Sequence, residues 1–100
     1  MEHLIEHEDQ ESKGAFFVPK DGQRVAEMTY SRTNASLITI DHTQVDASLS
    51  GKGVGRKLLG ALVSCVRGSG IKVVPLCPFA KAQFEKNSSI RDVLVLHVAG

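Results

Sequence analysis

Three glycines at alternating positions, Gly51, Gly53 and Gly55, stand directly before a stretch with apolar residues at helical spacing. A glycine loop that opens a helix can bind an anion, because the amides of the first turn lack partners and the helix dipole favours negative charge. Lys52 and Arg56 add positive charge to this loop. An ordinary loop–helix junction with capping glycines is the alternative that the sequence leaves open.

The spacing of these glycines narrows the choice of phosphate ligand. A Walker A loop needs GxxxxGK followed by Ser or Thr, which residues 50–58 do not provide. A dinucleotide-binding loop needs GxGxxG and an acidic residue at the end of the next strand, where this chain has Leu76 and Cys77. With 100 residues, the chain is also too short for a doubly wound sheet. Coenzyme A, whose pyrophosphate needs a single β–α–β unit, fits what remains.

Two further side chains could take part in group transfer. Cys77 follows a β-branched run and precedes a helix begun by Pro78, whose N-terminus would favour a nucleophilic thiolate. A small buried thiol that only fills space is the alternative. His42 ends a predicted strand and could take a proton near neutral pH, although a histidine held by a local hydrogen bond would look the same. The sequence does not tell whether Cys77 and His42 are in contact.

The elements that must position these residues fall into two halves. Alternating apolar residues predict strands over residues 4–7, 14–18, 24–31 and 35–42, the last continuing to residue 47 past a bend or bulge, with turns at 20–23 and 33–34. A helix follows, ended by Gly68 and Gly70, with the apolar face Val54, Leu58, Ala61, Leu62, Cys65 and Val66. A strand over residues 71–75, a helix over 78–86 and a last strand over 90–97 complete the chain. This order predicts a single α+β domain over residues 1–100, an antiparallel β-meander followed by a β–α–β unit and a second helix.

Composition excludes several classes of function. The formal charge of +1 gives no basic footprint for nucleic acid, and no apolar run is long enough to span a membrane. The two cysteines form neither a CxxC pair nor a disulfide framework, so we expect free thiols in the cytoplasm. His3 and His7 match HxxEH, but at a terminus with no room for a peptidase domain, and no metal site is expected.

Taken together, these residues resemble the GNAT superfamily of N-acetyltransferases. The loop over residues 51–56 is similar to the acyl-CoA loop of that superfamily. The chain looks like its short members of about this length, which carry His-Thr before the loop and Pro-x-Cys-x-Phe after the next strand. Here these are His42-Thr43 and Pro75-Leu76-Cys77-Pro78-Phe79, and the resemblance covers residues 14–87. Ser50 departs from the pattern, since the superfamily usually has Arg or Gln there.

The resemblance implies an acetyl-CoA-dependent N-acetyltransferase that acts on a primary amine, either a protein lysine or a small amine such as a polyamine. It places the adenosine diphosphate half of the cofactor on Gly51, Lys52, Gly53, Val54, Gly55 and Arg56. The pantetheine arm would lie between the strand ending near residue 47 and the strand over 71–75.

The same resemblance places His42 near the acetyl group, and its Cys-Pro-Phe motif supports Cys77 as a nucleophile that would take the acetyl group and pass it on. The resemblance also implies that the aromatic side of the helix over 78–86, with Phe79 and Phe84, lies against the pantetheine arm, although the sequence by itself favours core packing for each ring. A monomer or weak dimer is expected. A module that binds coenzyme A without transfer, for which Ser50 is the hint, and a small interaction domain are the alternatives.

Overall fold

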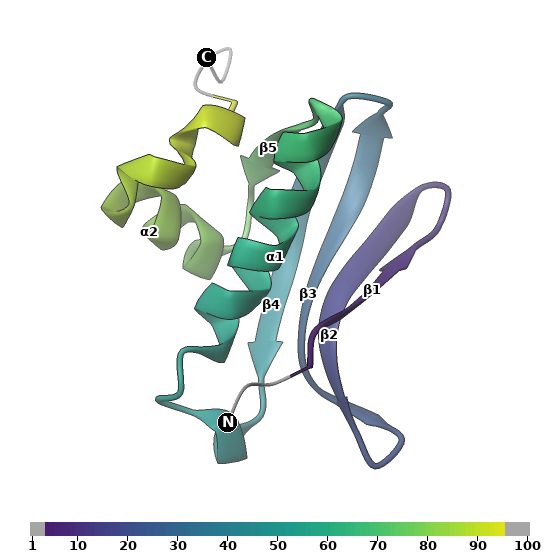
Figure 1. Ribbon diagram of the computed structural model, residues 1–100, viewed down its shortest axis with the longest axis vertical. Helices are drawn as coiled ribbons and strands as arrows, with labels where there is room; N and C mark the ends of the chain where they lie inside the picture. Colours follow the sequence, from purple (N-terminus) through teal and green to yellow (C-terminus); the bar gives the residue numbers. More distant parts are fainter. Residues whose placement is uncertain (1–3, 96–100) are drawn as a thin grey trace.

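The computed structural model describes residues 4–95, in which one mixed five-stranded sheet has the order β1-β2-β3-β4-β5. Strands β1 (Glu6–Asp9), β2 (Lys13–Lys20), β3 (Gln23–Asn34) and β4 (Leu37–Val45) form an antiparallel meander. Strand β5 (Lys72–Pro75) pairs parallel with β4 after helix α1 (Val54–Ser69) has crossed one face of the sheet (Figure 1). Helix α2 (Pro78–Lys86) follows β5, and two 3₁₀ helices, η1 (Ala47–Leu49) and η2 (Ser88–Val93), complete the described chain. The predicted α+β order is therefore confirmed.

Local sequence explains most of the boundaries. Asp21 and Gly22 adopt positive φ angles of 51° and 78°, which the two-residue hairpin between β2 and β3 requires. Helix α1 ends at Gly70, whose left-handed conformation lets its N–H donate to the Val66 carbonyl. Helix α2 begins with Pro78, a position where the missing N–H costs nothing. None of the described helices is long and apolar enough to cross a membrane.

Two predicted boundaries need correction. Strand β1 starts two residues later than residues 4–7 would have it, at Glu6. The turn between β3 and β4 lies at residues 35–36 instead of 33–34, because Asn34 Oδ1 accepts a hydrogen bond from the Ser36 N–H and closes the turn there.

The prediction of a last strand over residues 90–97 is wrong for residues 90–93. Residues Ser88–Val93 form η2, because the Asn87 side chain caps the Ser89 N–H and the Arg91 guanidinium donates to the Phe84 carbonyl. Leu94 then makes an isolated parallel bridge to Val73. Residues 96 and 97 lie outside the described part of the chain.

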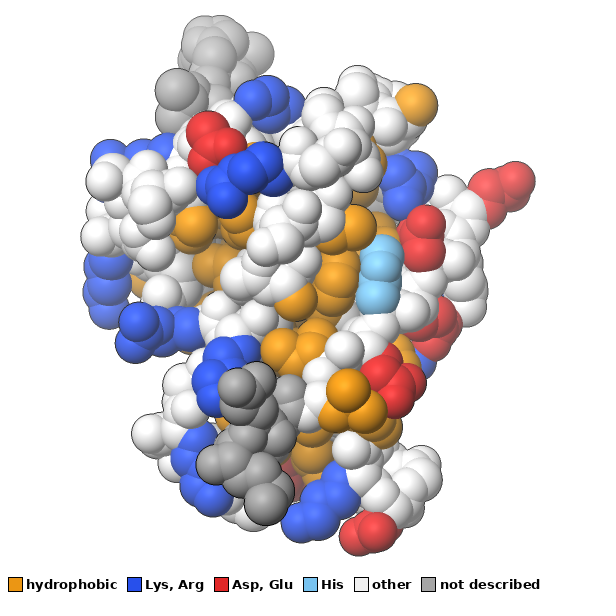
Figure 2. All heavy atoms as spheres, viewed as in Figure 1, with side chains coloured by type: hydrophobic (Ala, Val, Ile, Leu, Met, Phe, Trp, Pro, Cys, Tyr) orange, Lys and Arg blue, Asp and Glu red, His pale blue; other side chains and the backbone are white. Residues whose placement is uncertain are grey.

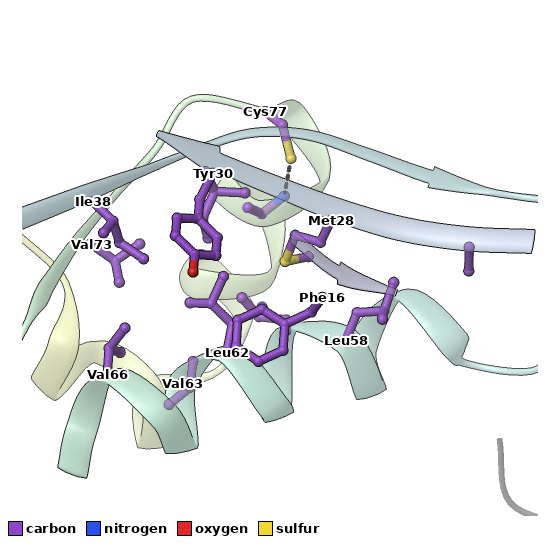
Figure 3. Packing of buried hydrophobic residues seen from close by; sticks show 14 of the residues in the cluster. Phe16, Met28, Tyr30, Ile38, Leu58, Leu62, Val63, Val66, Val73 and Cys77 are labelled. Atoms are coloured by element: carbon purple, nitrogen blue, oxygen red, sulfur yellow. Dashed lines mark hydrogen bonds between the residues drawn. The ribbon is translucent and has the colours of Figure 1, made fainter. Parts of the chain in front are cut away.

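The core lies between α1 and the face of the sheet that α1 crosses (Figure 3). The buried face of α1 consists of Val54, Gly55, Leu58, Leu59, Leu62, Val63 and Val66. Cys65, predicted on this face, is exposed instead. The reason is tertiary: η2 packs against α1, and Leu59 lines one groove together with Gln83 of α2 and Ile90 of η2. The buried stripe is thereby shifted towards Leu59 and Val63 and away from Cys65.

A polar cluster fastens β1 to the rest of the sheet. The Tyr30 hydroxyl donates to Asp9 over 2.9 Å and lies 2.7 Å from His7 Nε2, while Arg32 forms an ion pair with Asp9. The His7 ring also stacks on Phe16, with 4.0 Å between ring centroids. Burial raises the pKa of Tyr30 well above its ordinary value, and the hydrogen bonds from Tyr30 and Arg32 lower the pKa of Asp9.

Candidate functional site

The glycine loop leads directly into the first turn of α1, with two of its glycines in a conformation that other residues rarely adopt. Gly51 and Gly53 have φ angles of 80° and 71°, which place both in the left-handed region that favours glycine. Gly53 is the N-cap of α1 and supplies no side-chain cap, and its carbonyl accepts the N–H of Lys57 over 3.1 Å. The backbone N–H groups of residues 54–56, between Gly53 and Lys57, have no partner within the helix, so they are available to a negatively charged group.

A groove of about 460 Å³ continues from this loop between α1 and the α2 side of the molecule. Its basic side chains are Lys52, Arg56 and Lys57, and none of its described lining residues is acidic. Gln83 and Asn87 form the opposite wall. Basic side chains gather on the side of the molecule that α2 and the start of α1 form (Figure 2). A nucleotide with several phosphates fits such a groove, because cations and unpaired amides both face it. Sequence reasoning missed Lys57 and this wall.

Next to the loop, β4 and β5 part. They pair only from Leu37 with Lys72 to Ile40 with Pro75. The N–H groups of Leu76 and Cys77 both donate to the Ile40 carbonyl, over 3.0 and 3.2 Å, and close the ladder. Beyond this point β4 continues to Val45, whereas the segment after β5 turns into α2. The two strands between which the resemblance places the pantetheine arm therefore diverge beyond Ile40 and Pro75.

A bulge in β4 sets the directions of the side chains at this point. Tyr30 of β3 pairs with Ile40, but its neighbour Thr29 pairs with His42, so Asp41 is an extra residue in β4. Ile40 and Thr43 consequently face the helices, whereas Asp41 and His42 both face the opposite, open side of the sheet. His42 is exposed there, and the Ser31 hydroxyl donates to Asp41.

Cys77 lies on the helix side of the sheet, at the first turn of α2. Its side chain is buried, with 5% exposure. The sulfur accepts a hydrogen bond from the Ala80 N–H over 3.3 Å, the dashed line in Figure 3, and lies 3.2 Å from Thr43 Oγ1. A negative charge on this sulfur would thus meet an amide and a hydroxyl.

The structure does not bring Cys77 and His42 together. The bulge turns them to opposite sides of the sheet, and among the described residues no hydrogen bond joins them. Thr43 is the β4 residue that contacts Cys77. The His-Thr pair was visible in the sequence, but only the position of the bulge decides which of the two faces the cysteine.

The two phenylalanines differ in their surroundings. Phe79 is half-buried and its ring lies over Gly55, since a Cβ built on that glycine would be 2.8 Å from Phe79 Cζ. Phe84 is 2% exposed and belongs to the core, as the alternative reading expected. A contact of either ring with a cofactor stays a prediction.

On the open side of the sheet, a hollow of about 620 Å³ begins where β4 and β5 part. Asp41, His42 and Leu76 form its wall at that point, and it extends across the sheet to Arg24 and Glu8. Sequence reasoning did not find this hollow, because its lining comes from four strands and the bulge.

Comparison with known proteins agrees with this geometry. The family described as GCN5-related N-acetyl-transferase matches residues 15–93. A GCN5-like protein from Staphylococcus aureus has a similar solution structure, with 37% identity, a TM-score of 0.72 and coverage of 94% of this chain and 91% of that one. Among curated proteins, none matches the chain significantly.

Larger enzymes share the fold at lower identity. The ribosomal-protein-S18-alanine N-acetyltransferase from Escherichia coli is 20% identical, with a TM-score of 0.62 over 78% of this chain and 53% of that one. A GNAT family acetyltransferase from Elizabethkingia anophelis, solved with acetyl-CoA bound, is 11% identical, with a TM-score of 0.58 over 75% of this chain and 52% of that one. From the family match over most of its length, the chain belongs to the GCN5-related N-acetyltransferases, enzymes that use acetyl-CoA to acetylate amines.

Proposed function

We propose that this enzyme acetylates a primary amine by way of Cys77. The observation that carries the proposal is the position of this cysteine: its sulfur lies at the point where β4 and β5 part, between the Ala80 amide and the Thr43 hydroxyl. Cys65, by contrast, is exposed on α1.

The residues of the loop fit acetyl-CoA. The free amides at the start of α1 would hold the pyrophosphate, with Lys52, Arg56 and Lys57 beside the remaining phosphate and the nucleotide. The gap beyond Ile40 would take the pantetheine arm, which Phe79 would cover. Ser50 matters little in this arrangement, because amides supply most of the contacts. When bound, acetyl-CoA supplies a thioester with an electrophilic acetyl carbon.

Three side chains have distinct tasks in this proposal. Cys77 Sγ would take the acetyl group from the thioester, whose C–S bond breaks, and the proton of the Cys77 thiol would go to the departing coenzyme A sulfur. Cys77 then passes the acetyl group to the amine, with Thr43 and the Ala80 amide holding the sulfur in place. His42 faces the hollow from which the amine arrives and takes the proton that the amine nitrogen loses. The amine and His42 are then on one side of the sheet and Cys77 is on the other, so in this proposal the amine meets the acetyl group at the gap where β4 and β5 part.

Intact mass after incubation with acetyl-CoA tests the covalent route. We expect one acetyl group on the wild type and on the control Cys65→Ala, and none on Cys77→Ala. A thermal melt with coenzyme A, recorded on all three, should show the same stabilisation, because the cysteines are not needed for binding. Ligand stabilisation without any acetylated Cys77 would favour direct transfer or a module that only binds, and no stabilisation would refute the cofactor site.

The role of His42 is tested by separating the two half-reactions. His42→Gln should still become acetylated on Cys77, but its transfer of the acetyl group to an amine should slow by about 10²- to 10⁴-fold, the usual contribution of a general base. Equal slowing of both half-reactions would contradict a role confined to the amine.

A further inference from the structure

The hollow on the open side of the sheet holds two consecutive β4 residues, Asp41 and His42, that a regular strand would have turned to opposite faces. The bulge therefore places a carboxylate directly beside the imidazole. Both lie where β4 and β5 part, close to the end of the proposed acyl path. A substrate in this hollow would meet both side chains.

The Asp41 carboxylate has capacity for a ligand. It is half-buried and accepts the Ser31 hydroxyl, whereas a carboxylate offers about four acceptor sites. Within residues 4–95, no ion pair involves Asp41. Arg24, the guanidinium that lines the same hollow, is held by Glu8 and Glu27.

The other charged residues of the lining are Glu8, in β1, and Lys13, in β2. Glu8 is three strands away from His42, in the cross-strand row that runs through Ala15 and Thr29. Three strand spacings amount to about 14 Å. The carboxylate beside the reaction point is therefore that of Asp41.

An apolar surface completes this end of the hollow. Leu76, the neighbour of Cys77, lines it and is 57% exposed, although it is a large hydrophobic residue. A carboxylate beside an exposed leucine suits a ligand with a positively charged end and an aliphatic stem. Neither feature alone indicates a ligand, but here both adjoin the proposed reaction point.

We propose that Asp41 and Leu76 select the acceptor, a primary ammonium on an unbranched aliphatic stem, as in a lysine side chain or an alkylamine. This inference rests on the proposed amine acetylation. Asp41 holds the ammonium, and the methylene groups lie on Leu76. His42 takes one proton from the ammonium, and the free amine then attacks the acetyl carbon of acetyl-Cys77 at the gap between β4 and β5. As the C–N bond forms, the C–S bond breaks, and the departing sulfur takes the second proton of the nitrogen and leaves as the Cys77 thiol.

The test compares a charged with an uncharged nucleophile. Propylamine is a cation near neutral pH, whereas hydroxylamine is largely neutral. Asp41→Asn, which still accepts the Ser31 hydroxyl, should lower kcat/KM for propylamine by about 10- to 100-fold, the weight of a charge-assisted hydrogen bond. The same variant should leave hydroxylamine within about threefold and the KM for acetyl-CoA unchanged. Glu8→Gln removes a charge from the far end of the hollow and should change neither.

The Leu76 contact is tested with amines of increasing length, from methylamine to butylamine. In the wild type, kcat/KM should rise by up to about fourfold for each methylene group. Leu76→Ser should flatten this rise without weakening acetyl-CoA binding.

Each alternative outcome decides against a specific part. Equal losses with propylamine and hydroxylamine in Asp41→Asn would overturn the ammonium contact, as would an equal effect of Glu8→Gln. An unchanged chain-length series in Leu76→Ser would overturn the apolar contact. A wild type that becomes acetylated on Cys77 yet transfers to neither amine would refute the proposed function itself, and this inference with it.

Discussion

Gly55 and Gly68 lie in the same helix but in different surroundings, so the same substitution by alanine should have opposite effects. A Cβ built on Gly68 meets nothing within 4 Å. A Cβ on Gly55 would lie 2.8 Å from Phe79 Cζ and 3.2 and 3.3 Å from two further ring carbons. Gly68→Ala is therefore a matched control for Gly55→Ala.

The magnitude follows from two opposing terms. Alanine in place of an exposed helical glycine stabilises the helix by about 0.5–1 kcal/mol, which is the expected gain for Gly68→Ala. Carbon atoms prefer about 3.5–4.0 Å, so the Phe79 ring must retreat by about 1 Å in Gly55→Ala. Such overpacking costs about 1–3 kcal/mol, more than the helix gains. We expect Gly55→Ala to be less stable than Gly68→Ala by about 1–3 kcal/mol, or roughly 4–8 °C in Tm for each kcal/mol.

Urea unfolding and thermal melts of both variants, with and without coenzyme A, measure this difference. Because Phe79 covers the pantetheine arm in the proposed arrangement, a displaced ring should also reduce the stabilisation by coenzyme A, in Gly55→Ala and not in Gly68→Ala. If Gly55→Ala proved as stable as Gly68→Ala and bound coenzyme A as well, the packing of Phe79 over the start of α1 would be refuted.

Three further predictions concern the sheet and the groove. The ionised Asp9 stabilises the folded state above pH 3.8, its ordinary pKa, and this contribution is lost as the pH falls towards its lowered pKa. Between about pH 5 and about pH 2, the free energy of unfolding measured in urea should therefore fall less in Asp9→Asn than in the wild type. Gly14→Ala puts a Cβ 2.6 Å from the Glu8 carbonyl oxygen and against the Tyr30 ring, and should lower the free energy of unfolding in urea by about 3 kcal/mol, whereas an unchanged value would contradict this packing. Lys57→Gln should weaken coenzyme A binding by up to about tenfold in calorimetry and reduce its salt dependence, while the same change at Lys86, outside the groove, should not.

The sequence by itself determined the elements whose causes are local. Asp21-Gly22 specifies its hairpin, Gly70 the end of α1 and Pro78 the start of α2, because each acts through backbone angles or a missing N–H within one turn. The glycine loop was predictable for the same reason, since left-handed φ angles and a helix N-terminus need no distant partner. The family could also be inferred, because its motifs are contiguous in the chain.

Only the tertiary structure decided which residues meet. Register between β3 and β4 places one extra residue at Asp41, and that single bulge sends Thr43 to Cys77 and His42 to the open side. The same holds for Cys65, which lies outside the buried face of α1 because η2 packs against the flank that carries Leu59. A strand's alternation is local, but its phase is fixed by the partner strand, and a shift of one residue exchanges the two faces.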